Sequence, residues 1–236
     1  MIYEEIEKRL RSEACEDKVA VLSRFFKTGI GEYGYGDRFL GVTVPVNRRI
    51  VKDYIKTASA DDVSALTSSP YHEVRLAGFL LLVGIYSRSR TRDVVDFYLS
   101  LIDRGNNWDL VDLVAPKILG DWLVSHPEDR GVLDELVAMD GKLWHQRVAI
   151  VACWSIICNH EYDDTLRIVG KVLGHKHDLI HKASGWMLRE VGKRGGMVEL
   201  KGFLDKHAAR MPRTMLRYAI EQLSGDERRR YMSAGK

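Results

Sequence analysis

The segment Asn107-Trp108-Asp109-Leu110-Val111-Asp112 combines an aromatic ring with two carboxylates on a stretch predicted to be helical. Trp108 and Asp112 are four positions apart and share one helix face, and Asp109 lies three positions before Asp112 on a neighbouring line. Aspartate is a poor residue for a helix interior, and an unpaired buried carboxylate is costly. Taken alone, Asp112 is best interpreted as capping or pairing with a neighbouring helix, because structural ion pairs outnumber catalytic carboxylates.

The elements that must position this segment are predicted to be helices throughout. Apolar residues recur at helical spacing, as in Val94-Val95-Tyr98-Leu99-Ile102, and no stretch alternates with period two for long enough to predict a sheet. Helix boundaries are marked by turn and capping residues such as Ser69-Pro70 and Gly195-Gly196. We therefore expect an all-α protein with roughly ten to twelve helices of ordinary length.

The predicted helices repeat along the chain. Five segments align, at 72–77, 109–114, 144–149, 179–184 and 214–219, and their fourth residues are spaced by 37, 35, 35 and 35 positions. A period just under forty residues, with two helices per unit, is typical of a solenoid of HEAT-like repeats. We expect one domain over 1–236, with an N-terminal helical segment at 1–58 and helix-pair repeats at about 60–225. The expected fold is a right-handed superhelix whose second helices line a concave face.

The fourth residues of the five segments form what we call the repeat column. Its members are Arg75, Asp112, Arg147, Lys182 and Arg217. Four are cationic and one is anionic, so a concave face lined by them would attract phosphates and hold a single carboxylate. The alternative is a ladder in which each cation pairs with an acid on a neighbouring helix. For any single cation we slightly favour the ladder. For the column as a whole, the negative charge of Asp112 among four cations favours a functional site.

A second tryptophan supports the site. Trp186 lies four residues after Lys182, as Trp108 lies four before Asp112, and both are predicted to project from second helices. Tryptophans are usually core residues, and we expect Trp122, Trp144 and Trp154 to be so. Exposed tryptophan faces beside an aspartate and several arginines would suit a sugar, a base or a cation.

Composition narrows the class of protein. Hydrophobic residues make up 45% and charged residues 29%, with a net charge of +3, and no apolar run reaches membrane-spanning length. From Thr165 to Lys236 there are 16 Lys and Arg against 7 Asp and Glu, a balance that suits either a polyanion or a solvated cationic face. Three cysteines and scattered histidines form no metal-ligand spacing. We expect a cytoplasmic monomer without metal or cofactor.

The motifs resemble those of the AlkD-like alkylpurine DNA glycosylases, HEAT-like repeat enzymes of DNA alkylation repair. The resemblance runs from about Phe25 to about Glu221, with the motifs in the family's order. They are Asn107-Trp108-Asp109-Leu110-Val111-Asp112, Leu119-Gly120-Asp121, Trp144-His145-Gln146-Arg147-Val148-Ala149, His181-Lys182-Ala183-Ser184-Gly185-Trp186-Met187-Leu188-Arg189-Glu190 and Phe39-Leu40-Gly41-Val42-Thr43-Val44-Pro45. The sequence departs from the family at 29–36, a long loop rich in glycine and tyrosine.

The resemblance implies an activity and site residues. It implies a monofunctional glycosylase that binds duplex DNA and hydrolyses the N-glycosidic bond of cationic purines of the N3-methyladenine and N7-methylguanine type. Asp112 would stabilise the oxocarbenium-like transition state and orient water, and Trp108 and Trp186 would be aromatic walls. The residues expected to hold the DNA are Arg147, Lys182, Arg189, Arg75 and Arg217. Phe25 and Phe26 fall where relatives present an aromatic residue to DNA, although we expect both in the core.

Two other functions are compatible with the same charged residues. A non-catalytic HEAT-repeat protein could sense damaged or branched DNA through the basic face without using Asp112. A protein-binding scaffold, the commonest use of helical solenoids, could present the basic residues to an acidic partner.

Overall fold

The computed structural model describes residues 1–234 and is built from helices. Within these residues, β-type pairing is confined to an isolated bridge between Arg38 and Tyr71. The expected all-α helical repeat fold is confirmed. The chain divides into two compact units, Met1–Val114 and Ala115–Lys236, which are described separately below.

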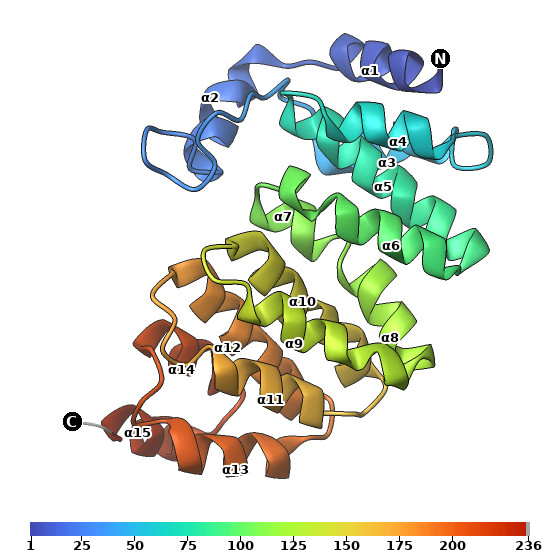
Figure 1. Ribbon diagram of the computed structural model, residues 1–236. Coiled ribbons are helices and arrows are strands. Elements are labelled where there is room, and N and C mark those ends of the chain that lie inside the picture. The colour runs from blue at the N-terminus through green and yellow to red at the C-terminus, as the bar shows by residue number, and fades with distance from the viewer. Residues whose placement is uncertain (235–236) are drawn as a thin grey trace. The chain divides into compact units, whose positions relative to one another are not determined.

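The first unit is organised around one long helix, α5. The helices of this unit are α1 (Ile2–Ser12), α2 (Glu16–Phe25), α3 (Val44–Lys52), α4 (Ala60–Thr67), α5 (His72–Ser89), α6 (Arg92–Ser100) and α7 (Trp108–Asp112), with a 3-10 turn at Ile102–Arg104. Helices α1, α3, α4, α6 and α7 all pack on α5, and Figure 1 shows α3, α4 and α5 side by side. Most of α5 is buried, in keeping with its run of apolar side chains.

The second unit continues as pairs of antiparallel helices. It contains a π-helical turn (Pro116–Gly120), α8 (Asp121–Ser125), a 3-10 turn (Pro127–Arg130), α9 (Gly131–Ala138), α10 (Leu143–Cys158), α11 (Asp163–Lys171), α12 (Asp178–Lys193), α13 (Met197–His207), α14 (Arg213–Ala219) and α15 (Gly225–Ser233). Helix α10 packs against α9, α11 and α12, and α12 against α13 and α14 (Figure 1).

The predicted repeat register matches the observed helices. The members of the repeat column lie on α5, α7, α10, α12 and α14, and each of these helices follows a first helix, α4, α6, α9, α11 or α13. Neighbouring second helices can approach closely where the sequence supplies glycine. A Cβ added at Gly185 of α12 would lie 2.5 Å from the carbonyl oxygen of Met215 on α14, so only glycine allows this contact.

The tryptophans expected in the core differ in burial. Trp122 is buried, and its indole nitrogen donates to Asp129 at 2.7 Å. Trp144 and Trp154 of α10 are half-buried instead, and the guanidinium of Arg194 lies over the Trp154 ring, 5.1 Å from its centroid. Among residues 1–234, no helix is both long and apolar enough to cross a membrane.

Candidate functional site

Helix α7 carries Trp108 and Asp112 and is only five residues long. Its start is fixed by Asn107, which is fully buried. The side-chain oxygen of Asn107 accepts from the amide of Trp108 at 2.9 Å, and its Nδ2 donates to the carbonyl oxygen of Phe26 at 3.2 Å. A single asparagine therefore caps the helix and joins it to the end of α2.

Trp108 packs against two aromatic rings at the end of α2. Its ring lies 5.5 Å from that of Phe26 in a stacked arrangement and 5.8 Å from that of Phe25 edge-on. Phe26 is buried, as expected. Phe25 is 59% exposed, so the expectation that it is a core residue is wrong. The reason is that α2 buries none of its residues and lies across a hollow rather than on packed side chains.

Asp112, at the end of α7, is partly exposed. Its charge acts on Tyr98 of α6, a phenol that is almost fully buried. Burial raises the pKa of Tyr98, and the negative charge of Asp112 raises that pKa further. The carboxylate of Asp112 therefore lies within electrostatic reach of buried groups of the first unit while it keeps contact with solvent.

Asp109, the other carboxylate of α7, is buried and pairs with His72 of α5. Its Oδ2 lies 2.9 Å from Nε2 of His72, and Nδ1 of His72 lies 3.0 Å from Oδ2 of Asp37. Burial lowers the pKa of His72, but hydrogen bonds and charges from Asp109 and Asp37 outweigh burial and raise the pKa to about 9.

Arg75, a member of the repeat column, belongs to the same buried cluster. Its guanidinium donates to Asp37, to Asn106 at 2.7 Å and to the carbonyl oxygen of Ser69 at 2.9 Å. Burial raises the pKa of Asp37, yet His72 and Arg75 outweigh that effect and hold it below its usual range. Arg75 is buried, and its two terminal nitrogens bond to groups of the first unit, whereas its Nε has no hydrogen-bond partner. Its pairing with Asp37 is the kind of contact that the ladder alternative predicts, and its expected role in holding DNA stays a prediction.

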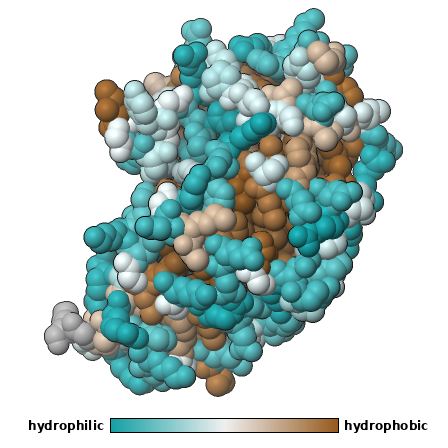
Figure 2. Space-filling view, viewed as in Figure 1, coloured by the Kyte–Doolittle hydropathy of each residue, from teal (hydrophilic) through white to brown (hydrophobic). Residues whose placement is uncertain are grey.

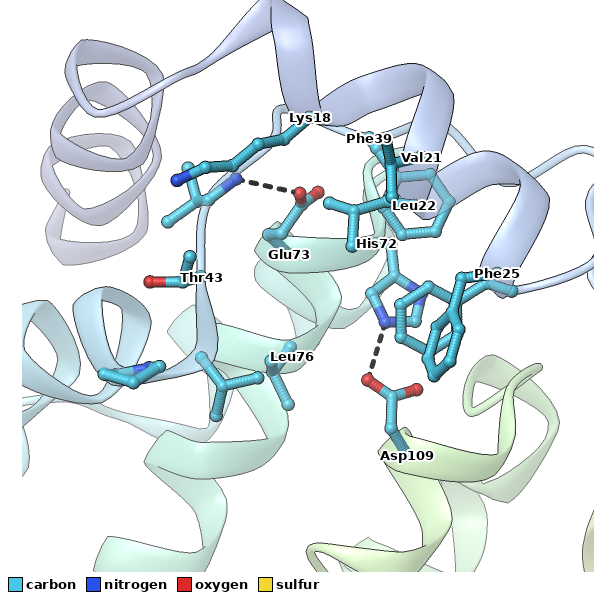
Figure 3. Close-up of a pocket in the computed structure, with 14 residues that line it drawn as sticks. Lys18, Val21, Leu22, Phe25, Phe39, Thr43, His72, Glu73, Leu76 and Asp109 are labelled. Atoms are coloured by element: carbon cyan, nitrogen blue, oxygen red, sulfur yellow. Dashed lines mark hydrogen bonds and ion pairs between the residues drawn. The ribbon is translucent and has the colours of Figure 1, made fainter.

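A cavity of about 450 Å³ lies beside this cluster, under α2 (Figure 3). Its walls are apolar, and they include Val21, Leu22, Phe25, Phe26, Phe39, Val42, Pro45 and Leu76. Its polar and charged lining residues are Lys18, Thr43, His72, Glu73 and Asp109. The second oxygen of Asp109, Oδ1, is buried and has no hydrogen-bond partner.

The loop at 29–36, where the sequence departs from the family, is folded back on itself. The amide of Gly34 donates to the carbonyl oxygen of Lys27 at 3.0 Å, and that of Gly29 donates to the Glu32 carboxylate at 2.8 Å. Ile30 at the tip is 91% exposed. A hydrophobic projection at the upper left of Figure 2 stands where Figure 1 places this loop.

In the second unit, Arg147 and Arg189 are engaged with protein groups. Arg147 is buried on α10, and its Nη1 donates to the carbonyl oxygen of Leu179 at 2.6 Å. Arg189 of α12 pairs with Glu221 at 2.5 Å and is partly exposed. Arg147 thus contacts a backbone carbonyl oxygen rather than an acid of a ladder, and Arg189, which lies outside the repeat column, forms an ion pair with Glu221. The expectation that both hold DNA stays a prediction.

The remaining predicted residues of the second unit reach solvent. Trp186 and Lys182 of α12 are both partly exposed, and Lys182 pairs with Asp178 of the same helix at 2.6 Å. Arg217 of α14 is exposed, and within residues 1–234 it has no ion-pair partner. The structure thus brings together Trp108 and Asp112 on α7, and Trp186 and Lys182 on α12, each pair inside its own unit.

Sequence reasoning missed His72 and Asp37. A signal for His72 was present, because His72 precedes Asp109 by 37 positions, the same offset that separates Arg75 from Asp112 in the repeat column. Equivalent positions of adjacent repeats tend to stack, so this offset could have predicted the pair. Asp37 lies outside the repeats, in the loop before α3, and no sequence spacing connects it to His72.

Comparisons with known proteins agree with this architecture. A family model described as a DNA alkylation repair enzyme matches residues 6–223. A solved structure described as a predicted DNA alkylation repair enzyme from Enterococcus faecalis superposes with a TM-score of 0.75 at 17% sequence identity, covering 90% of this chain and 98% of that one. No curated protein sequence matches this chain.

Proposed function

Because the chain belongs to the family of DNA alkylation repair enzymes, the AlkD-like family that its motifs resemble, we propose that it is a monofunctional DNA glycosylase. Its proposed substrates are duplex DNAs that contain cationic alkylated purines of the N3-methyladenine or N7-methylguanine type. The observation that carries the proposal is α7, on which a partly exposed carboxylate and an aromatic ring share one face.

The chemistry follows from charge. Alkylation at N3 or N7 makes the purine cationic and a good leaving group, so the reaction needs no general acid. Positive charge grows on the deoxyribose as the glycosidic bond stretches, and a preorganised carboxylate stabilises that charge. Asp112 would supply the carboxylate and orient the attacking water. The ring of Trp108, held by Phe25 and Phe26, would present its electron-rich face to the same developing cation.

The second unit is proposed to contribute DNA contacts. Trp186 is a second candidate aromatic contact to the substrate, by resemblance to the family. Lys182, Arg189 and Arg217 reach solvent and could neutralise phosphates, which position DNA without reading its sequence. Arg147 is buried against Leu179, so its proposed part is to support α12, on which Trp186 and Lys182 lie.

The test compares base release by wild type and Asp112→Asn on duplex DNA that contains N7-methylguanine. We expect Asp112→Asn to lose release by roughly 100-fold or more, the range seen when one transition-state electrostatic partner is removed, with DNA affinity within a small factor of wild type. Asp93→Asn is a matched control, because Asp93 is an exposed aspartate of the first unit, on α6. Unchanged release by Asp112→Asn would exclude this residue as the catalytic group.

The same experiment separates the other functions. A protein that only recognises damaged DNA would bind the duplex with a steep dependence on salt and release no base in any variant. A protein-binding scaffold would show weak DNA binding that barely changes with salt.

A further inference from the structure

We propose that His72 is a positioning residue for base excision: as an imidazolium between Asp37 and Asp109, it fixes α7 and therefore Trp108 and Asp112. The inference rests on the proposed function, since it assigns a role in the same reaction. His72 is not proposed to be catalytic, because its side chain is only 2% exposed.

The hydrogen bonds of His72 define its charge state. Both ring nitrogens face carboxylate oxygens, at 3.0 Å for Asp37 and 2.9 Å for Asp109. An ionised carboxylate only accepts hydrogen bonds, so each ring nitrogen must carry a hydrogen to bond its partner. An imidazole that carries both hydrogens is a cation. A neutral ring would turn one nitrogen lone pair toward a carboxylate lone pair and lose that bond.

The charges around the ring balance only when His72 is protonated. Arg75 of the same helix and His72 together offset Asp37 from the loop and Asp109 from α7. The neighbouring Glu73 turns its carboxylate away, toward three backbone amides, and Lys18 of α2 lines the cavity beside the ring. Loss of the His72 proton would leave one buried negative charge without a counter-charge, which proteins tolerate poorly.

The ring is also fixed by packing. Phe26 and Phe39 lie against His72 with ring centroids 4.8 Å away in both cases. Phe26 in turn stacks on Trp108 and accepts the Asn107 hydrogen bond at its carbonyl oxygen. His72 therefore contacts α7 by two routes, through the Asp109 carboxylate and through the ring of Phe26.

The short length of α7 makes these contacts decisive for Asp112. A five-residue helix has little stability of its own and takes its orientation from tertiary contacts. Asp109 lies directly after Trp108 and three residues before Asp112, so loss of the His72 contact removes one of the few contacts that orient both side chains. The Asn107 cap and the aromatic packing of Trp108 remain, so we expect a shift of α7 rather than its unfolding. A misplacement of about 1 Å at a catalytic group can lower a rate by roughly 100-fold.

The test measures the single-turnover rate of base excision as a function of pH in wild type, His72→Gln and Asp109→Asn. The rate of uncatalysed base release, which itself depends on pH, is subtracted at each point. We expect the wild-type rate to fall as pH rises through about 9, where the imidazolium loses its proton. Asp109→Asn keeps the shape of the partner but removes one of the two anions that favour the cation. We expect this variant to stay active at neutral pH and its fall to move about one pH unit or more lower.

His72→Ala and His72→Gln distinguish a role of His72 in positioning α7 from a general role in folding. We expect His72→Ala to lose excision roughly 10- to 100-fold at neutral pH. His72→Gln should recover part of that loss, because its amide can still donate to one carboxylate, and it should show no fall in rate near pH 9. If the rate falls at the same pH in wild type and in Asp109→Asn, the proposal is overturned, because the fall then reports a titrating group other than His72.

Nuclear magnetic resonance of the free protein keeps this test independent of excision. We expect nitrogen-15 shifts of the His72 ring to show both nitrogens protonated at neutral pH, and the Trp108 indole signal to move with the same midpoint as the His72 titration. His72→Gln should abolish that movement. A neutral His72 ring at neutral pH, or a Trp108 signal that ignores the titration, would refute the positioning role even if the protein excises bases. If the protein excises no base while both signals behave as expected, the coupling stands and the proposed function fails.

Discussion

Glu73 should be one of the most sensitive positions of the first unit, because one buried carboxylate serves three backbone amides. It is 2% exposed. Its Oε2 accepts from the amide of Leu40 at 2.9 Å, and its Oε1 accepts from those of Gly41 at 2.9 Å and Val42 at 3.1 Å. These amides belong to the segment that leads into α3, and the Glu73 carboxylate binds all three of them to the start of α5. Just before them, the carbonyl oxygen of Arg38 accepts from the amide of His72 at 2.8 Å, so Glu73 extends an existing contact along the segment.

The loss of stability expected for Glu73→Gln can be worked out from these three hydrogen bonds. The amide oxygen of Gln can take over the two bonds at Oε1, but its NH₂ group would then face the donor of Leu40. One charge-assisted bond is lost, two become neutral, and one buried amide is left without an acceptor. With hydrogen bonds to charged groups contributing about 1.5–3 kcal/mol and a stranded buried donor costing about 1–3 kcal/mol, we expect a loss of roughly 3 kcal/mol of stability.

Amide hydrogen exchange measures this loss where it occurs. In Glu73→Gln, the amides of residues 40–42 should exchange roughly 100-fold faster than in wild type, which corresponds to about 3 kcal/mol at 1.4 kcal/mol per tenfold change. Amides of the second unit are the internal control. Unchanged protection at residues 40–42, with a loss of stability below about 0.5 kcal/mol, would refute the argument that this carboxylate organises the segment.

Three further predictions address pH, packing and the surface. The pKa of His72 is about 9 in the folded protein against an ordinary 6.5, so protonated His72 stabilises the fold fully below pH 6.5, and this stabilisation is lost as pH rises through 9. Thermal melts should therefore show the first unit roughly 3 kcal/mol less stable above pH 9 than below pH 6.5. A stability that does not change with pH over this range would contradict the prediction. Gly185→Ala should destabilise the second unit by roughly 2–3 kcal/mol in urea, because the new Cβ would lie 2.5 Å from the Met215 carbonyl oxygen; a neutral effect would mean that α14 shifts freely. Glu13→Gln should change stability by less than about 1 kcal/mol, because the Arg49–Glu13 pair is exposed, and a larger loss would show that the pair is not an ordinary surface contact.

The sequence alone predicted the helical fold and the position of its key segment. Apolar spacing of 3.6 residues is a local property, so it predicted helices without any tertiary information. The offset of 35 to 37 residues predicted which helices are equivalent, because each repeat uses the same positions to stack on the next. The same register selected Asp112 as the anionic member of the repeat column, and the motifs predicted the family that the comparisons show.

Tertiary structure decided the environment of each charge. Arg75 and Arg217 occupy equivalent repeat positions, yet Arg75 is buried against Asp37 whereas Arg217 is exposed. Asp37 comes from a loop outside the repeats, and periodicity says nothing about where such a loop folds. The imidazolium of His72 likewise exists only because that loop and α7 place two carboxylates on one ring. Charge state and exposure depend on contacts between distant segments, and those contacts have no signature in local sequence.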